Sequence, residues 1–359
     1  MSFKTSRSTE MGVVASRGAP GSMMPRPTPH VGRRWIVPVS VPLLLASLTL
    51  SLTVGARTIP FDSFVELLLH PDGSGDSVVV WLERVPRTIA ATCVGMAVGV
   101  AGALIQALTR NSLADPGILG VNAGAALFVG LGLAVLGISS ASGYVWLALA
   151  GALLVTLAVY SIGSTGRGHV DPGRLTLAGV ALGAVLGGIV TAMTLLDPQA
   201  FDRMRNWNAG SLVNRGLDVV LPVLPFLMLG LLLAVWSARS LNAIAVGDDL
   251  AQGLGVNVTQ TRVLVIIAVT LLAGSATAIA GPIAFVGLMI PHIARWIVGP
   301  DHRWIIAGTV LLAPTLVLVA DVLGRVVLAS GEVPVGIVTA FIGAPVLIVL
   351  VRRKRTSAL

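Results

Sequence analysis

Residues 84–127 read RVPRTIAATCVGMAVGVAGALIQALTRNSLADPGILGVNAGAAL and contain the pattern that decides the fold. From 88 to 108 the side chains are uncharged and mostly apolar, with arginines flanking the run on both sides. A helix needs about 20 such residues to cross a bilayer. Asp115, Pro116 and Gly117 then predict a turn, and a second apolar run covers 117–138. The stretch predicts two successive membrane-crossing helices.

The whole chain has the same apolar character. Of its 359 residues, 55% are apolar and 11% are charged, and the mean hydropathy is +0.90. Soluble domains carry about 25% charged residues, so the sequence excludes a soluble protein and predicts an all-α, polytopic membrane protein. Lys4 and Lys354 are the only lysines, which excludes a Walker A phosphate loop. A single cysteine, Cys93, excludes a disulfide scaffold, and the five scattered histidines argue against a metal site.

Apolar runs of suitable length predict ten membrane-spanning helices. They cover residues 35–54, 88–108, 117–138, 144–163, 175–196, 218–237, 263–281, 283–298, 304–324 and 334–351. We expect a disordered cytoplasmic tail at 1–34, a ten-helix permease domain at 35–353 and a short C-terminal tail at 354–359. A cleaved signal peptide is the alternative for the first run, but about 20 residues exceeds the usual apolar core of such a peptide.

Between the first two runs, residues 61–69 are too short to cross a membrane. Phe61, Phe64, Val65 and Leu68 fall on one helical face, which predicts a helix lying in the membrane interface. An even number of spans puts both termini on one side. Basic residues at Arg33, at Arg34 and from 352 to 355 predict that this side is the cytoplasm.

Acidic residues and histidines are scarce within the predicted spans. A proton-driven carrier normally holds such groups in mid-membrane, so a secondary carrier is the disfavoured alternative. Asp321 stands four residues before Arg325 and predicts a structural ion pair. A membrane-embedded enzyme would need paired acids or histidines, but Asp115 and Asp171 each precede Pro-Gly and predict turns. His292 is expected to pack rather than to bind metal.

Three arginines lie on the predicted external side, against the usual bias. Arg84 and Arg87 open the second span, and Arg325 closes the ninth. They either extend to lipid headgroups or form a basic patch that docks an acidic soluble partner. Both interpretations stay open from the residues alone.

The cytoplasmic segment from 238 to 262 has a helix start at Gly247, Asp248 and Asp249, where acids favour the positive end of the helix dipole. Gly253 and Gly255 interrupt this helix. Two short helices at an angle would suit contact with a cytoplasmic partner, and a plain connecting loop is the alternative.

Several stretches together resemble a known family. Besides residues 84–127, these are AVGDDLAQGLGVNVTQTR at 245–262, AGPIAFVGLMIPHIARWIVGPDHRW at 280–304, ADVLGR at 320–325 and EVPVGIVTAFIGAP at 332–345. In their order and spacing they are similar to ABC-type importer permeases for iron–siderophores, haem and cobalamin. The resemblance covers residues 35–353. Ser112 and Asn122 depart mildly from the family pattern.

The resemblance implies a type II ABC importer permease fold. It implies a homo- or heterodimer with two cytoplasmic ATPase subunits and an external substrate-binding lipoprotein, in the cytoplasmic membrane of a bacterium. The chain is then no enzyme and binds no cofactor or metal, and its partner uses ATP. By position, Arg84, Arg87 and Arg325 match arginines that receive glutamates of the binding protein. Residues in the matching ATPase-coupling motif are Gly247, Asp248, Asp249, Leu254 and Gly255.

An iron–siderophore is the expected cargo, ahead of cobalamin or haem. A bulky chelate needs a smooth wall, because release requires weak binding. The span beginning at residue 175 offers small or apolar residues for such a wall. The expected pathway residues are Leu177, Ala178, Val180, Ala181, Ala184 and Val185. The segment 165–176 lies where related permeases place a cytoplasmic gate.

Overall fold

The ten apolar runs each form a helix. The computed structural model describes residues 32–55, 59–138, 140–164, 172–328 and 331–356, and within these ranges it contains helices and no strand. The helices that match the predicted spans are α1 Gly32–Thr53, α4 Val85–Thr109, α5 Val121–Ala134, α6 Ala141–Gly163, α7 Pro172–Leu196, α10 Leu224–Val246, α12 Val258–Ala280, α13 Val286–Val298, α14 His302–Val326 and α15 Val335–Thr356. The all-α prediction is confirmed. The N-terminal tail up to residue 31, Asp171 and most of the gate segment 165–176 lie outside the described residues.

Seven helices of the described part are long and apolar enough to cross a membrane, when α4 is counted with α3 (Gly75–Val78) and η1 (Val79–Arg84) before it. The helices α5, α13 and the apolar part of α15 are shorter. The helices α5 and α13 begin later than predicted, because Pro116–Leu119 forms a separate 3₁₀ turn, η2, and Gly281–Phe285 is not helical. The predicted span 218–237 is likewise split, since a one-turn helix α9 (Leu217–Val220) precedes α10.

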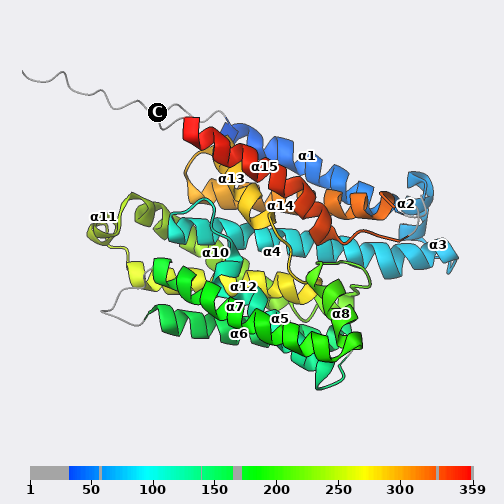
Figure 1. The fold of residues 1–359 in the computed structure, drawn as a ribbon. Coiled ribbons are helices and arrows are strands. Elements are labelled where there is room, and N and C mark those ends of the chain that lie inside the picture. Colours follow the sequence, from blue (N-terminus) through cyan, green and yellow to red (C-terminus); the bar gives the residue numbers. More distant parts are fainter. Residues whose placement is uncertain (1–31, 56–58, 139, 165–171, 329–330, 357–359) are drawn as a thin grey trace, which may run out of the picture. The chain divides into compact units, whose positions relative to one another are not determined.

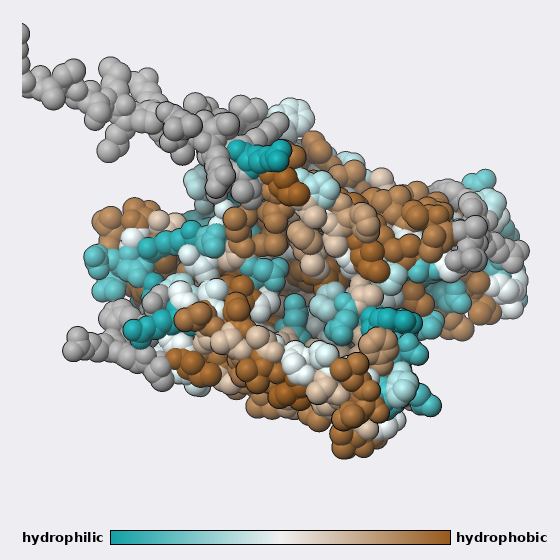
Figure 2. Space-filling view, in the orientation of Figure 1, coloured by the Kyte–Doolittle hydropathy of each residue, from teal (hydrophilic) through white to brown (hydrophobic). Residues whose placement is uncertain are grey.

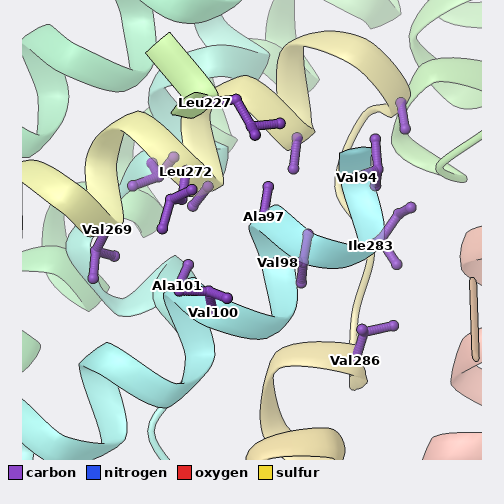
Figure 3. Packing of buried hydrophobic residues seen from close by; sticks show 14 of the residues in the cluster. Val94, Ala97, Val98, Val100, Ala101, Leu227, Val269, Leu272, Ile283 and Val286 are labelled. Carbon is purple, nitrogen blue, oxygen red and sulfur yellow. The ribbon is translucent and has the colours of Figure 1, made fainter. Parts of the chain in front are cut away.

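The helices α4 and α12 form the centre of the bundle. Both are buried along most of their length, whereas α1 and α7 expose most of their surface. Figure 3 shows Val94, Ala97 and Val98 of α4 among side chains of α10, α12 and α13. Apolar faces gain little by leaving lipid for protein, so such contacts stabilise the bundle through close packing.

Two glycines of α4 permit its close approach to α14. A Cβ atom added at Gly95 would lie 2.5 Å from the Cα atom of Pro314, and one at Gly99 would lie 2.4 Å from the Cβ atom of Ala313. Gly183 and Gly187 of α7 have the same spacing, but a Cβ atom at Gly183 would lie 3.8 Å from the Cβ atom of Ala123, an ordinary contact, and one at Gly187 would meet open space. The same sequence motif therefore packs helices in one place and leaves a smooth surface in the other.

The two ends of the bundle carry different short helices. α2 (Phe61–Leu69) and α3 lie at one end, and α11 (Asp248–Gly253) lies at the other (Figure 1). The α2 helix is present as predicted, but it buries Phe64 and Leu67 against Val80, while Val65 is exposed. An amphipathic helix that was not predicted, α8 (Pro198–Asn208), is capped by Asp197. Apolar side chains cover much of α6, α7 and α15, and hydrophilic ones gather near α11 (Figure 2).

Three helix ends and their adjoining non-helical residues meet in the bundle, and together we call them the junction: residues 207–211, 280–285 and 334–336. The Ser211 N–H donates to the Ala280 carbonyl (2.8 Å), and the Gly336 N–H donates to the Gly210 carbonyl (3.0 Å). Gly210 and Gly281 have positive φ angles of 69° and 76°, which glycine adopts without strain. Irregular backbone is tolerated at membrane depth only where protein buries it or where it lines a cavity. The junction meets both conditions.

Candidate functional site

The three arginines predicted to act together do meet, in a group that we call the arginine network: Arg84, Arg87 and Arg325 with Asp321 and Glu332. The Arg87 Nε donates to both Asp321 oxygens (3.1 and 3.0 Å), and its Nη1 lies 2.7 Å from Glu332 Oε2. The predicted pair of Asp321 with Arg325 is confirmed, and the Arg325 Nε donates to Asp321 Oδ2 over 3.0 Å. One carboxylate therefore serves two guanidinium groups.

Arg84 and Arg325 also bind the carboxyl end of α1. Arg84 donates to the Leu52 and Thr53 carbonyls (2.8 and 2.7 Å), and Arg325 donates to the Ser51 carbonyl (2.8 Å). A cation there satisfies unpaired carbonyls and the negative end of the helix dipole. Arg84 is 5% exposed and Arg325 is 4% exposed. The expected open basic patch is thus a buried network in this structure, with Arg87 closest to solvent.

At the opposite end, Gly247–Gly255 forms the segment that the sequence assigns to ATPase coupling. Its helix α11 begins and ends at backbone positions with positive φ, 137° at Gly247 and 82° at Gly255. Asp248 accepts hydrogen bonds from Arg110 and from Arg262, the latter at 2.7 Å. Asp248 therefore holds the segment against α4 and α12, while Asp249 is exposed.

Two leucines of this segment are presented outward. Leu250 and Leu254 are exposed, Leu254 to 72%, whereas Ala251 between them packs with Ile244 and Val258. The sequence analysis included Leu254 among the predicted coupling residues but did not include Leu250. Apolar side chains flanking a short helix at a polar end of the bundle suit contact with a partner protein.

Five of the six expected pathway residues are exposed on the surface of α7. The buried face of this helix is narrow and contains Leu175, Gly179 and Leu186 instead. Ala178 is half-buried and packs against the core. Two cavities of the described part, of about 530 and 480 Å³, lie elsewhere, and none of the six residues lines them. A wall formed by α7 would therefore need a second protein opposite it.

The first of these cavities, the outer cavity, has a volume of about 530 Å³ and lies at the end of the bundle that carries α8. It is lined by Leu133, Ala141, Tyr144, Arg203, Asn206, Trp207, Ser211, Val213, Asn214, Arg215 and Pro334. The polar lining comes from α6, α8 and the segment directly after α8. Arg203, Asn206 and Trp207 have the spacing of one helical face, but the sequence analysis did not mark them because it did not predict α8. Only the fold adds Tyr144 of α6 to this group.

The second cavity, the inner cavity, has about 480 Å³ and is mostly apolar. Its polar lining consists of Asp115, Asn122 and Asn208, with junction residues 282–285 and 336 completing the wall. Asp115 forms the expected turn, since it accepts a hydrogen bond from the Gly117 N–H (2.8 Å). It also faces this cavity, which its position before Pro-Gly did not predict. Junction residues line both cavities, Trp207 in the outer one and Asn208 in the inner one.

The structure also places the remaining candidates. No group of three or more metal-ligating side chains occurs in the described ranges. Cys93 is buried in α4. His292 packs edge-on against Trp296, with the ring centres 4.9 Å apart, which agrees with its expected packing role.

Known proteins resemble this chain along nearly its full length. The FecCD transport family matches residues 43–353. The ferric enterobactin transport system permease protein FepD of Escherichia coli (strain K12) is 49% identical over 90% of this chain and 97% of its own. The hemin transport system permease protein HmuU of Yersinia pestis is 38% identical over 77% of this chain and 84% of its own.

A solved structure has the same fold. It is a metal-chelate type ABC transporter in an inward-facing conformation, with a TM-score of 0.79 and 26% identity over 89% of this chain and 99% of its own. The family match over residues 43–353, the relative at 49% identity and this shared architecture agree with one another. The chain belongs to the FecCD transport family.

Proposed function

We propose that this chain is the transmembrane permease subunit of an ATP-binding-cassette importer that carries a ferric siderophore across the cytoplasmic membrane. The observation that carries the proposal is the 49% identity to a ferric enterobactin permease across 97% of that protein. The geometry agrees, because two cavities border the junction in a bundle whose helices are long and apolar enough to cross a membrane. Haem is the second candidate cargo, since a hemin permease is 38% identical.

In this proposal the chain hydrolyses no ATP itself. Separate ATPase subunits bind the coupling segment, and Leu250 and Leu254 enter a groove of that partner. The exposure of both leucines and the anchoring of Asp248 by Arg110 and Arg262 support this role. The α11 end then faces the cytoplasm, with both termini on that side, and the arginine network faces outward.

We propose that the binding protein docks over the arginine network. Arg87 is the arginine nearest to solvent and is already bridged to Glu332. A glutamate of the binding protein would compete with Glu332 for Arg87. Arg84 and Arg325 would then hold α1 and α14 rigid below the contact, or take up glutamates only after their present bonds open. A second permease subunit completes the pathway against the exposed face of α7.

Transport in proteoliposomes tests the proposal. We expect ATP-dependent accumulation of ⁵⁵Fe-labelled ferric catecholate siderophore when the permease is reconstituted with ATPase and binding protein, and none with an ATPase lacking its catalytic lysine. Accumulation of haem in place of the siderophore would select the second candidate. Accumulation by the chain alone under a pH or sodium gradient would refute an ABC importer.

A charge reversal tests the docking step separately. Arg87→Glu should slow uptake and weaken its dependence on salt, since rim charges act mainly on association. Arg205→Glu, at an exposed ion pair on α8, is the matched control. Unchanged uptake in the Arg87 variant would remove the docking role.

A further inference from the structure

The outer cavity has a lining unlike that of the rest of the bundle. Two guanidinium groups, Arg203 and Arg215, two amides, Asn206 and Asn214, and the aromatic rings of Tyr144 and Trp207 share its wall. No carboxylate belongs to that lining. A volume of about 530 Å³ falls within the range of small-molecule sites, about 300–1,000 Å³.

Two of these side chains are buried in a way that requires an explanation. Arg215 is only 9% exposed, lies over the Tyr144 ring with its guanidinium carbon 5.4 Å from the ring centre, and donates a hydrogen bond to the Tyr144 hydroxyl. Trp207 is 4% exposed, and its indole Nε1 is buried without a hydrogen-bond partner. A buried donor without a partner costs about 1–3 kcal/mol. This nitrogen has almost no surface open to the cavity, so Trp207 contributes its aromatic ring to the wall rather than a donor.

The charge of the cavity is not neutralised by neighbouring acids of the described part. Neither Arg203 nor Arg215 forms an ion pair with a described carboxylate, whereas Arg205 on the same helix pairs with Asp202. Arg215 also borders a smaller cavity of about 260 Å³ that contains Glu83 and Glu332, and Glu332 is bridged to Arg87. The outer cavity therefore presents two positive charges to an occupant.

We infer that the outer cavity is a substrate subsite for an anionic, aromatic metal chelate of the ferric tris-catecholate class. The inference rests on the proposed function. Three catecholates around Fe³⁺ leave a net charge of minus three, whereas three hydroxamates leave none. Guanidinium groups match phenolate oxygens in charge and hydrogen-bond geometry and also stack on aromatic rings. The amide N–H groups of Asn206 and Asn214 offer further donors to the oxygen-rich edge of the chelate.

The same chemistry argues for a chelate rather than a carboxylate of a docking protein. A glutamate would be neutralised by one accessible guanidinium, but it would leave the recessed aromatic wall uncovered. The cavity also adjoins the junction through Trp207, Ser211 and Pro334. A chelate held there lies next to the junction, whose residues also line the inner cavity.

Equilibrium dialysis of ⁵⁵Fe-labelled chelates against the full-length chain in nanodiscs tests the subsite. Arg203→Gln and Arg215→Gln should each weaken binding of a ferric tris-catecholate about tenfold, as expected for one lost charge-assisted hydrogen bond. Arg205→Gln, on the same helix but outside the cavity, should bind like the wild type. A neutral ferric tris-hydroxamate should respond to none of these changes.

Two choices of variant keep the test decisive. If Arg215→Gln fails to fold, Arg215→Lys can replace it, because lysine retains the positive charge. Arg203 is exposed, so Arg203→Gln leaves the core intact. Unchanged catecholate binding in Arg203→Gln, or equal losses for both chelates, would overturn the subsite. The subsite would also be overturned if Arg203→Gln bound the chelate as the wild type does but captured the binding protein more weakly.

Uptake by the wild-type complex separates the two hypotheses. If the wild type accumulates ferric catecholate and the arginine variants match it in both binding and uptake, only the subsite is refuted. If the wild type accumulates no ferric chelate, the proposed function falls, and the subsite falls with it.

Discussion

Asp321 is the side chain on which the arginine network depends, so Asp321→Asn is the most informative single substitution. The carboxylate is 1% exposed and accepts from Arg87 at 2.8–3.1 Å and from Arg325 at 3.0 Å. Asparagine has nearly the same volume but no charge, and its amide nitrogen cannot accept. The substitution removes the carboxylate that Arg87 and Arg325 share and leaves Arg87 with its bridge to Glu332.

The expected effect is large because the group is buried. Removing one partner of a buried ion pair costs about 3–5 kcal/mol, since the remaining charge stays uncompensated. A tenfold change in an equilibrium constant corresponds to about 1.4 kcal/mol. The unfolding equilibrium of the variant should therefore shift by between about a hundredfold and a few thousandfold.

Equilibrium unfolding of the purified protein in detergent micelles, followed by tryptophan fluorescence, measures this shift. Asp202→Asn is the matched control, because Asp202 and its ion-pair partner Arg205 are both exposed. Exposed ion pairs contribute about 0–1 kcal/mol to stability. Adding Arg325→Gln to Asp321→Asn should recover part of the loss, since it removes one uncompensated charge. A loss below about 1 kcal/mol for Asp321→Asn alone would refute a structural role for the network.

Three further predictions concern packing, coupling and pH. Gly102→Ala should lower thermal stability measurably, because its Cβ would lie 2.0 Å from a backbone carbonyl of α13, whereas Gly187→Ala, in open space, should be neutral or slightly stabilising. Asp248→Asn should lower the ATPase rate of the assembled complex and loosen α11 in hydrogen exchange, because it removes an acceptor from two arginines, and Asp249→Asn should change α11 exchange little. Asp301 is partly buried, which raises its pKa, but hydrogen bonds from an asparagine and a backbone N–H and a nearby arginine lower that pKa more, to below the ordinary 3.8. The ionised Asp301 should stabilise the fold above pH 4, and this stabilisation should be lost as the pH falls through the lowered pKa. The melting temperature of Asp301→Asn should therefore fall less on acidification than that of the wild type.

The course of α4 through the membrane could be predicted from the sequence, while its exact neighbours could not. The uncharged run after Arg87 and the turn at Asp115 are local patterns, and the structure reproduces both. The sequence did not predict the late start of α5, because within an apolar run the residues of a 3₁₀ turn have the same hydrophobic pattern as the first turn of an α-helix. The spacing of Asp321 and Arg325 predicted their pair, but the second partner of Asp321 lies 234 residues away in the chain, and no sequence period reports it.

The sequence by itself determined the all-α membrane architecture and the family, because hydrophobic length and local motifs are written along the chain. Only the tertiary structure decided that Arg84 and Arg325 are buried under α1 rather than exposed. It alone placed Tyr144 of α6 beside Arg215 and so completed the outer cavity. Burial and cavity lining depend on which distant helices meet, and that is settled by packing over the whole bundle.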